Sequence, residues 1–77
     1  MERNEVWAEV EKELDRHVSL WGRQDGAWND SLEKKLVVLA EEFGEIAMAL
    51  NDHDFDNLKT ELIQTISVAA SWLLTEY

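Results

Sequence analysis

The chain of 77 residues contains no cysteine and no proline, and only three glycines. Without cysteine, disulfides and thiolate metal sites are excluded as reinforcements of the fold. The lack of proline and the scarcity of glycine leave little that would interrupt a helix. A chain this short buries only about 60% of the surface that its unfolded state exposes. We therefore expect a single domain, residues 1–77, that is all-α and completes its core by self-association.

Basic residues are also scarce. Seven lysines and arginines stand against seventeen aspartates and glutamates, which gives a net charge of −10. Binding to DNA or RNA needs Lys and Arg against the phosphates, so this composition disfavours bare nucleic acid as a partner. No secretory leader pattern opens the chain, and no apolar run is long enough to span a bilayer. We expect a cytoplasmic protein that does not contact a membrane.

Apolar residues recur at helical spacing in three segments, which predicts helices over residues 4–18, 31–51 and 57–77. The residues placed to cap them are Asn4, Asp30 or Ser31, and Asp54 or Asp56. Between the last two helices the sequence NDHDFDN is acidic and contains His53, but it lacks the spacing and the glycine of a calcium loop. His17 in the first helix has no second ligand at a suitable spacing. We predict that both histidines are surface or boundary residues.

The second helix is apolar on nearly every side. One broad stripe, which predicts a core face, consists of Leu36, Leu39, Ala40, Phe43, Ile46, Ala47 and Leu50. On the opposite side Glu41, Glu42 and Glu45 are interleaved with Val37, Val38, Met48 and Ala49. Three carboxylates within such a surface are costly unless a cation meets them, and a divalent metal is the simplest cation for the purpose.

The third helix repeats this arrangement. Its predicted core line is Leu58, Leu62, Ile66, Ala69 and Leu73, and its other face resembles the wall of a polar cavity, with Glu61, Gln64, Thr65, Val68, Ser71, Trp72 and Thr75. Glu61 and Gln64 project from one side of the helix, as Glu42 and Glu45 do on the second helix. Packed antiparallel, the two helices can direct both pairs into one space. Such oxygen ligands suit Mg²⁺ or Mn²⁺, which commonly recruit the phosphates of a substrate as further ligands.

The loop between the first two helices, SLWGRQDGAWN, holds two of the four tryptophans. Trp21 and Trp28 can simply anchor the loop to the core. Alternatively, an aromatic ring beside polar side chains such as Gln24 forms a shelf on which a nucleobase stacks. The sequence leaves both interpretations open.

Two runs, LAEEFGEIAMAL and ELIQTISVAASWL, together resemble the MazG-like all-α nucleoside triphosphate pyrophosphohydrolases, whose motif is ExxE followed after a spacer by ExxD. EFGE covers Glu42 to Glu45, and ELIQ covers Glu61 to Gln64. The loop LWGRQDGAW is similar to the WGxQ-type loop that precedes the acidic helix in these proteins. The resemblance extends over roughly residues 14 to 75.

The resemblance implies Mg²⁺-dependent cleavage of an NTP or dNTP to the monophosphate and pyrophosphate, in a house-cleaning role. It implies that Glu42, Glu45, Glu61 and Gln64 are metal ligands. By the same resemblance Glu42 and Glu41 are expected to be the catalytic residues, with Glu41 serving as base, holding a second metal or merely pairing with Lys34 on the surface. It also implies that Trp21, Gln24 and Trp72 bind the nucleotide.

Gln64 departs from the family pattern, which has Asp at this position. A neutral amide is a weaker Mg²⁺ ligand than a carboxylate. The alternative interpretation is therefore a catalytically silent MazG-like module that binds a nucleotide or a protein. The family core has four helices per bundle and this chain predicts three, so the resemblance also implies a homodimer or higher homo-oligomer.

Overall fold

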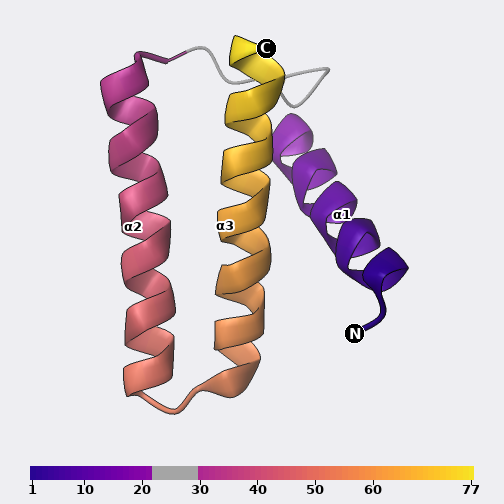
Figure 1. Ribbon diagram of the computed structural model, residues 1–77, viewed down its shortest axis with the longest axis vertical. Helices are drawn as coiled ribbons and strands as arrows, with labels where there is room; N and C mark the ends of the chain where they lie inside the picture. Colours follow the sequence, from indigo (N-terminus) through magenta and orange to yellow (C-terminus); the bar gives the residue numbers. More distant parts are fainter. Residues whose placement is uncertain (22–29) are drawn as a thin grey trace.

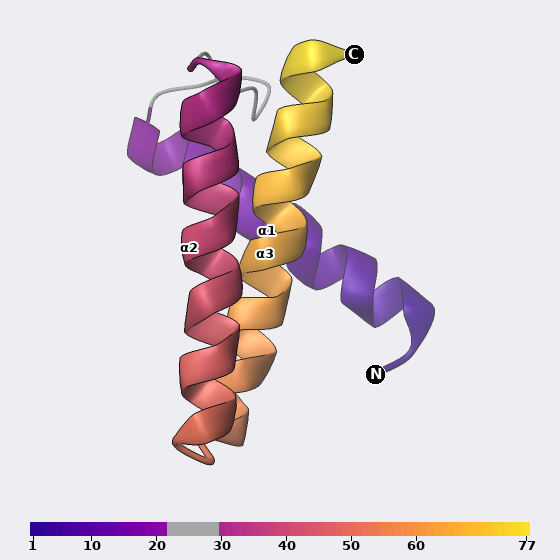
Figure 2. The same ribbon diagram turned by 60° about the vertical axis from the view of Figure 1, so that its left-hand side comes forward.

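The protein is described by a computed structural model that covers residues 1–21 and 30–77, and the side chains of these residues except 18–21. Three helices form: α1 (Arg3–Trp21), α2 (Leu32–Asn51) and α3 (Phe55–Glu76). The described residues contain no strand, which confirms the all-α prediction. Helices α2 and α3 run antiparallel side by side, and α1 crosses obliquely beside and behind them (Figures 1 and 2). None of these helices, over the residues described, has the length and apolar character needed to cross a bilayer.

The caps of α2 and α3 follow the sequence prediction. The Ser31 hydroxyl accepts a hydrogen bond from the backbone N–H of Lys34 at 3.2 Å. The Asp54 carboxylate accepts one from the backbone N–H of Asn57, also at 3.2 Å. The predicted cap of α1 is wrong, because the helix begins at Arg3 and therefore already includes Asn4. Helix α1 also extends to Trp21, past the predicted end at residue 18.

A short turn joins α2 to α3 and makes the pair a helical hairpin. His53 adopts a left-handed backbone conformation with φ of 55°, as the residue after a helix often does. The backbone N–H of Asp54 then reaches back to the carbonyl of Ala49 at 2.9 Å. The exposed His53 ring stacks on Phe55, with 6.1 Å between ring centroids. His53 is thus the surface residue that the sequence predicts.

The interior of the protein is built mainly on the polar face of α3. Helices α1 and α2 both pack on α3. The buried side chains in the described part of the chain are Val10, His17, Lys35, Ala49, Glu61, Ser67, Val68 and Ser71. Ser67 and Ser71 are small enough to let neighbouring helices approach α3 closely. The face of α3 predicted as a cavity wall is therefore the face that packs.

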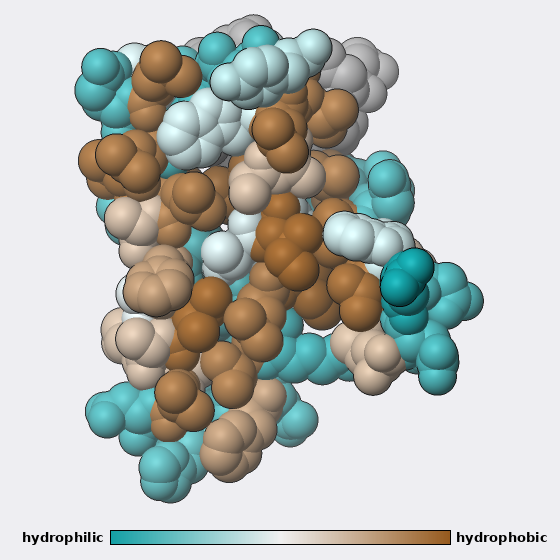
Figure 3. Space-filling view, in the orientation of Figure 1, coloured by the Kyte–Doolittle hydropathy of each residue, from teal (hydrophilic) through white to brown (hydrophobic). Residues whose placement is uncertain are grey.

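The predicted core stripes of α2 and α3 are wrong for the single chain. Leu36, Phe43 and Leu50 on α2 are exposed, and so are Leu62, Ile66 and Leu73 on α3. We call these six residues the open apolar face. Figure 3 shows apolar side chains spread across α2 and α3 on the side of the hairpin that faces the viewer. A three-helix chain buries only one side of its hairpin, so the other apolar side stays in water.

A buried ion pair fastens the start of α2 to the end of α3. The Lys35 side chain is 0% exposed, and its Nζ donates to Oε1 of Glu76 at 2.6 Å. A buried ammonium group is tolerated only where acceptors surround it. The pair therefore fixes the open end of the hairpin, opposite the His53 turn.

Replacing Glu76 with Gln should lower the free energy of unfolding by about 2 kcal/mol, because it leaves the buried Lys35 charge without its carboxylate. Urea unfolding measures this change. Glu11→Gln, on the exposed surface of α1, is the control and should change stability by no more than about 0.5 kcal/mol. A Glu76→Gln variant as stable as this control would show that the ion pair does not hold the helix ends together.

Candidate metal centre

Three carboxylates from two helices meet between α2 and α3, where Glu61 is buried, Glu42 is half-buried and Glu45 is exposed. Glu42 and Glu45 lie one turn apart on α2, and Glu61 comes from α3. One oxygen of each carboxylate lies within 4.8 Å of the others. The antiparallel hairpin therefore brings together three of the four side chains that the sequence predicts as metal ligands.

Two oxygens of this carboxylate cluster have no hydrogen-bond partner. Oε2 of Glu42 and Oε2 of Glu61 are both buried and accept no hydrogen bond. Glu61 is only 9% exposed, so little water reaches its carboxylate. Buried oxygens of this kind are costly unless a ligand satisfies them. A hard divalent cation such as Mg²⁺ or Mn²⁺ fits an all-oxygen donor set.

The electrostatics of the cluster favour protons when no cation is present. Burial raises the pKa of Glu61 to about 7, and hydrogen bonding with Glu45 and the charges of Glu45 and Glu42 add to the shift. Burial also raises the pKa of Glu42, assisted by the nearby charges of Glu45, Glu13 and Glu41. Such a carboxyl group keeps its proton when no cation is bound. A bound cation would instead stabilise the ionised carboxylate.

The remaining predicted site residues of these two helices differ in their surroundings. Gln64 is half-buried, one turn beyond Glu61 on α3, so its amide lies on the same side of the helix. Glu41 is exposed and does not belong to the group of three carboxylates. Its position agrees with a role at the edge of the site or on the surface.

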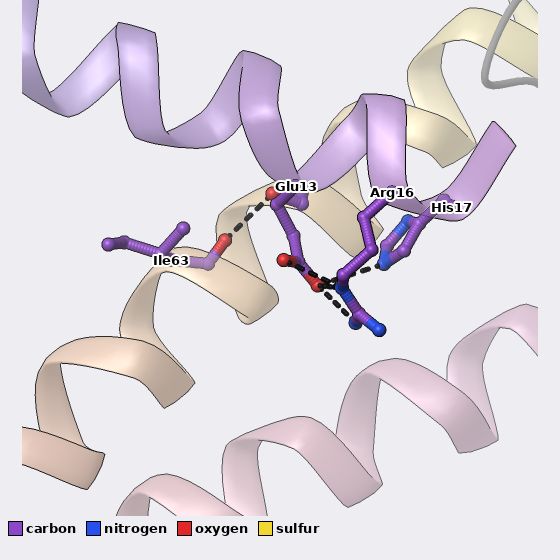
Figure 4. Close-up of polar contacts among 5 residues, drawn as sticks. Glu13, Arg16, His17 and Ile63 are labelled. Atoms are coloured by element: carbon purple, nitrogen blue, oxygen red, sulfur yellow. Dashed lines mark hydrogen bonds and ion pairs between the residues drawn. The ribbon is translucent and has the colours of Figure 1, made fainter. Parts of the chain in front are cut away.

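Helix α1 brings charged side chains to the cluster that the sequence analysis missed. Arg16 bonds through Nε to both carboxylate oxygens of Glu13, each at 3.0 Å, and the group extends from α1 toward α2 (Figure 4). The charges of Glu13 and Arg16 both act on Glu42. Yet α1 and α2 do not pack against each other among the described residues. The carboxylate cluster on one side thus faces an arginine–glutamate pair on the other.

His17 belongs to the same group, and its predicted place at the boundary is wrong. The side chain is buried, with Nε2 3.3 Å from Oε1 of Glu13. Glu13 stands four residues earlier, which is the acid at helical spacing that the sequence analysis overlooked. Burial lowers the pKa of His17, while Glu13 opposes this shift.

Trp72, from the predicted nucleotide-binding set, is not assembled with the carboxylates. Trp72 is half-buried on α3, about 16 Å along the helix axis from Glu61. With Leu32, Ala69, Leu73, Glu76 and Tyr77 it lines a largely apolar pocket of about 540 Å³. Gln24 lies outside the described residues, and the Trp21 side chain lies outside the described side chains.

Comparison of the chain with models of protein families, with curated proteins and with solved structures finds no match. The function proposed below is supported by the residues of the site and by the motif in the sequence.

The metal-free protein should lose stability as the pH rises from about 4.5 to about 7. In this window folded Glu61 keeps a proton that the unfolded chain releases, so deprotonation favours unfolding. His17 acts in the opposite direction below pH 6.5, because its pKa is lowered in the folded state. Urea unfolding in EDTA at pH 5 and pH 8 should therefore compare the wild type with Glu61→Gln. The loss between the two pH values should be smaller in the variant, and an equal loss would place Glu61 in an ordinary solvated environment.

Proposed function

We propose that the protein is a Mg²⁺-dependent or Mn²⁺-dependent hydrolase that cleaves a nucleoside triphosphate to the monophosphate and pyrophosphate. The observation that carries the proposal is the meeting of Glu42, Glu45 and Glu61, with buried oxygens that have no protein partner. The resemblance of the two acidic motifs to MazG-like pyrophosphohydrolases supports the choice of substrate and a house-cleaning role.

In this proposal Glu42, Glu45 and Glu61 hold the cation, and the Gln64 carbonyl is a weaker fourth ligand. A bound divalent cation supplies Lewis acidity, which neutralises phosphate charge and makes water a better nucleophile. The oxygen of water forms a bond to the α-phosphorus, and the bond from this phosphorus to the oxygen of the β-phosphate breaks. The water proton passes to a carboxylate, for which Glu41 at the exposed edge is our candidate.

We also propose that two copies of the chain pair through the open apolar face. Phe43, near its centre, is 68% exposed, and large exposed apolar patches on a small protein mark association surfaces. Six half-exposed side chains offer on the order of 100 Å² each. Their sum of about 600 Å² is three-quarters of the roughly 800 Å² that each partner buries in a standard interface. On α2 the spacing of Leu36, Phe43 and Leu50 is seven residues, the repeat of a helix that packs in a bundle.

Replacing Glu42 with Gln should abolish pyrophosphate release from NTPs and dNTPs and leave the fold intact, because it removes one ligand charge. In EDTA the variant should be slightly more stable than the wild type, since one of three repelling charges is gone. The measurement is pyrophosphate release from a nucleotide panel with Mg²⁺, Mn²⁺ or EDTA, together with urea unfolding. Glu11→Gln is the control for a loss of charge elsewhere and should match the wild type.

A Glu42→Gln variant that unfolds would make Glu42 structural and the site assignment wrong. Release that persists in EDTA would exclude the metal. If the wild type binds Mn²⁺ by calorimetry but releases no pyrophosphate, the silent-module alternative holds. Gln64→Asp then tests its cause, because a restored carboxylate should tighten Mn²⁺ binding on the order of tenfold and raise turnover.

Leu36→Lys should shift the protein to a monomer, because it places a charge within the open apolar face. Val37→Lys is a matched control: the two residues are 59% and 55% exposed, but Val37 lies a quarter-turn away on the helix. Sedimentation velocity at several concentrations measures the assembly state. Self-association that survives Leu36→Lys, or that Val37→Lys disrupts equally, would place the interface elsewhere.

A further inference from the structure

Arg16 is a cation placed opposite the carboxylate cluster on a different helix. Its side chain is half exposed, whereas the Glu13 carboxylate that holds it is 14% exposed. Figure 4 shows the guanidinium extended from α1 toward α2, with Glu13 and His17 on either side of it. Glu13 takes up only some of the five N–H donors of the guanidinium, so others remain for a ligand.

The charges explain why a cation is needed at this place. Three carboxylates and one divalent cation leave a net negative charge, and a polyphosphate carries several more. A single metal therefore does not offset the repulsion between the cluster and such a ligand. A positive group on α1, in a site partly shielded from water, supplies the additional positive charge that such a ligand needs.

Glu13 holds the Arg16 side chain in its position on α1. Arg16 is close enough for its charge to interact with that of Glu42. Its hydrogen bonds to Glu13 fix it on α1, and they lower the pKa of Glu13. Helix α1 packs on α3 and not on α2 in the described part of the chain, so Arg16 extends toward α2 from a helix that is docked elsewhere.

We propose that Arg16 binds the phosphate oxygens of a metal-bound polyphosphate, and that Glu13 orients it for this purpose. The inference rests on the proposed function and adds a phosphate-binding residue from α1, outside the acidic motifs. Arginine suits the role because its planar fork of donors matches two phosphate oxygens at once. Arg16 positions the leaving pyrophosphate and takes no part in proton transfer.

The test is calorimetric titration of the full chain with Mn²⁺ alone, and then with inorganic pyrophosphate at saturating Mn²⁺. In Arg16→Gln the affinity for Mn²⁺ should be unchanged or slightly higher. The affinity for pyrophosphate should fall on the order of 10- to 100-fold, as expected for losing hydrogen bonds to a charged group. Arg16→Lys keeps the charge but not the fork, so its loss should be intermediate.

Lys12→Gln is the matched control. Lys12 pairs with Glu9 one turn earlier on the same helix, with the same i, i+3 spacing and with both side chains more exposed. Its pyrophosphate affinity should stay within about twofold of the wild type, as for a surface charge outside the site. Circular dichroism follows the helix content of each variant. Arg16→Lys retains a cation for Glu13. If Arg16→Gln loses helix content, the calorimetric titration of Arg16→Lys with pyrophosphate tests the role of Arg16 instead.

The outcomes separate the two proposals. Mn²⁺-dependent pyrophosphate binding that neither Arg16 variant weakens overturns the role of Arg16 and leaves the proposed function standing. An equal loss in Lys12→Gln also overturns it, because the effect would then be one of overall charge. A wild-type protein that binds neither Mn²⁺ nor pyrophosphate overturns the proposed function and this inference with it.

Discussion

The mutual repulsion of Glu42, Glu45 and Glu61 is the constraint on which the rest of the structure depends. Helix packing holds these carboxylates within 4.8 Å of one another, although burial and like charge raise the pKa of both Glu42 and Glu61. Other contacts stabilise the hairpin against this repulsion. They are the caps at Ser31 and Asp54, the tight turn at His53, and the Lys35–Glu76 ion pair at the opposite end. Each of these features fixes the register of α2 against α3. A shift of one residue would rotate the carboxylates by about 100° and disperse them.

The hairpin has two faces, one polar and one apolar. One face carries the carboxylates and packs with α1 in the interior, and the other carries large apolar side chains in water. A small chain cannot cover both with three helices. The polar face became the interior of the chain because small residues, Ser67 and Ser71, permit close helix packing there. The apolar face is thereby left uncovered by the chain itself.

Local features of the structure could be predicted from the sequence, and long-range ones could not. Ser31 and Asp54 predict where their helices begin, because capping depends on hydrogen bonds within one turn. The pairing of Glu42 and Glu45 with Glu61 was predictable because a short connection forces α2 and α3 to run antiparallel. The side of each helix that faces inward was predicted wrongly, since Leu36 and Phe43 read as core residues whichever chain covers them. The position of Arg16 could not be predicted, because no local pattern in the sequence tells which side of the hairpin α1 meets.

The short turn at His53 has a consequence for the order in which the protein folds. All three carboxylates belong to one helical hairpin, so the contacts that assemble them are close in sequence and form quickly. Helix α1 docks on α3 alone, with no packing on α2 in the described residues, so it adds to a hairpin that is already complete. We therefore expect the carboxylate cluster to form before α1 brings Arg16 to it. Local unfolding of α1 should cost less free energy than unfolding of the hairpin, because fewer contacts hold α1.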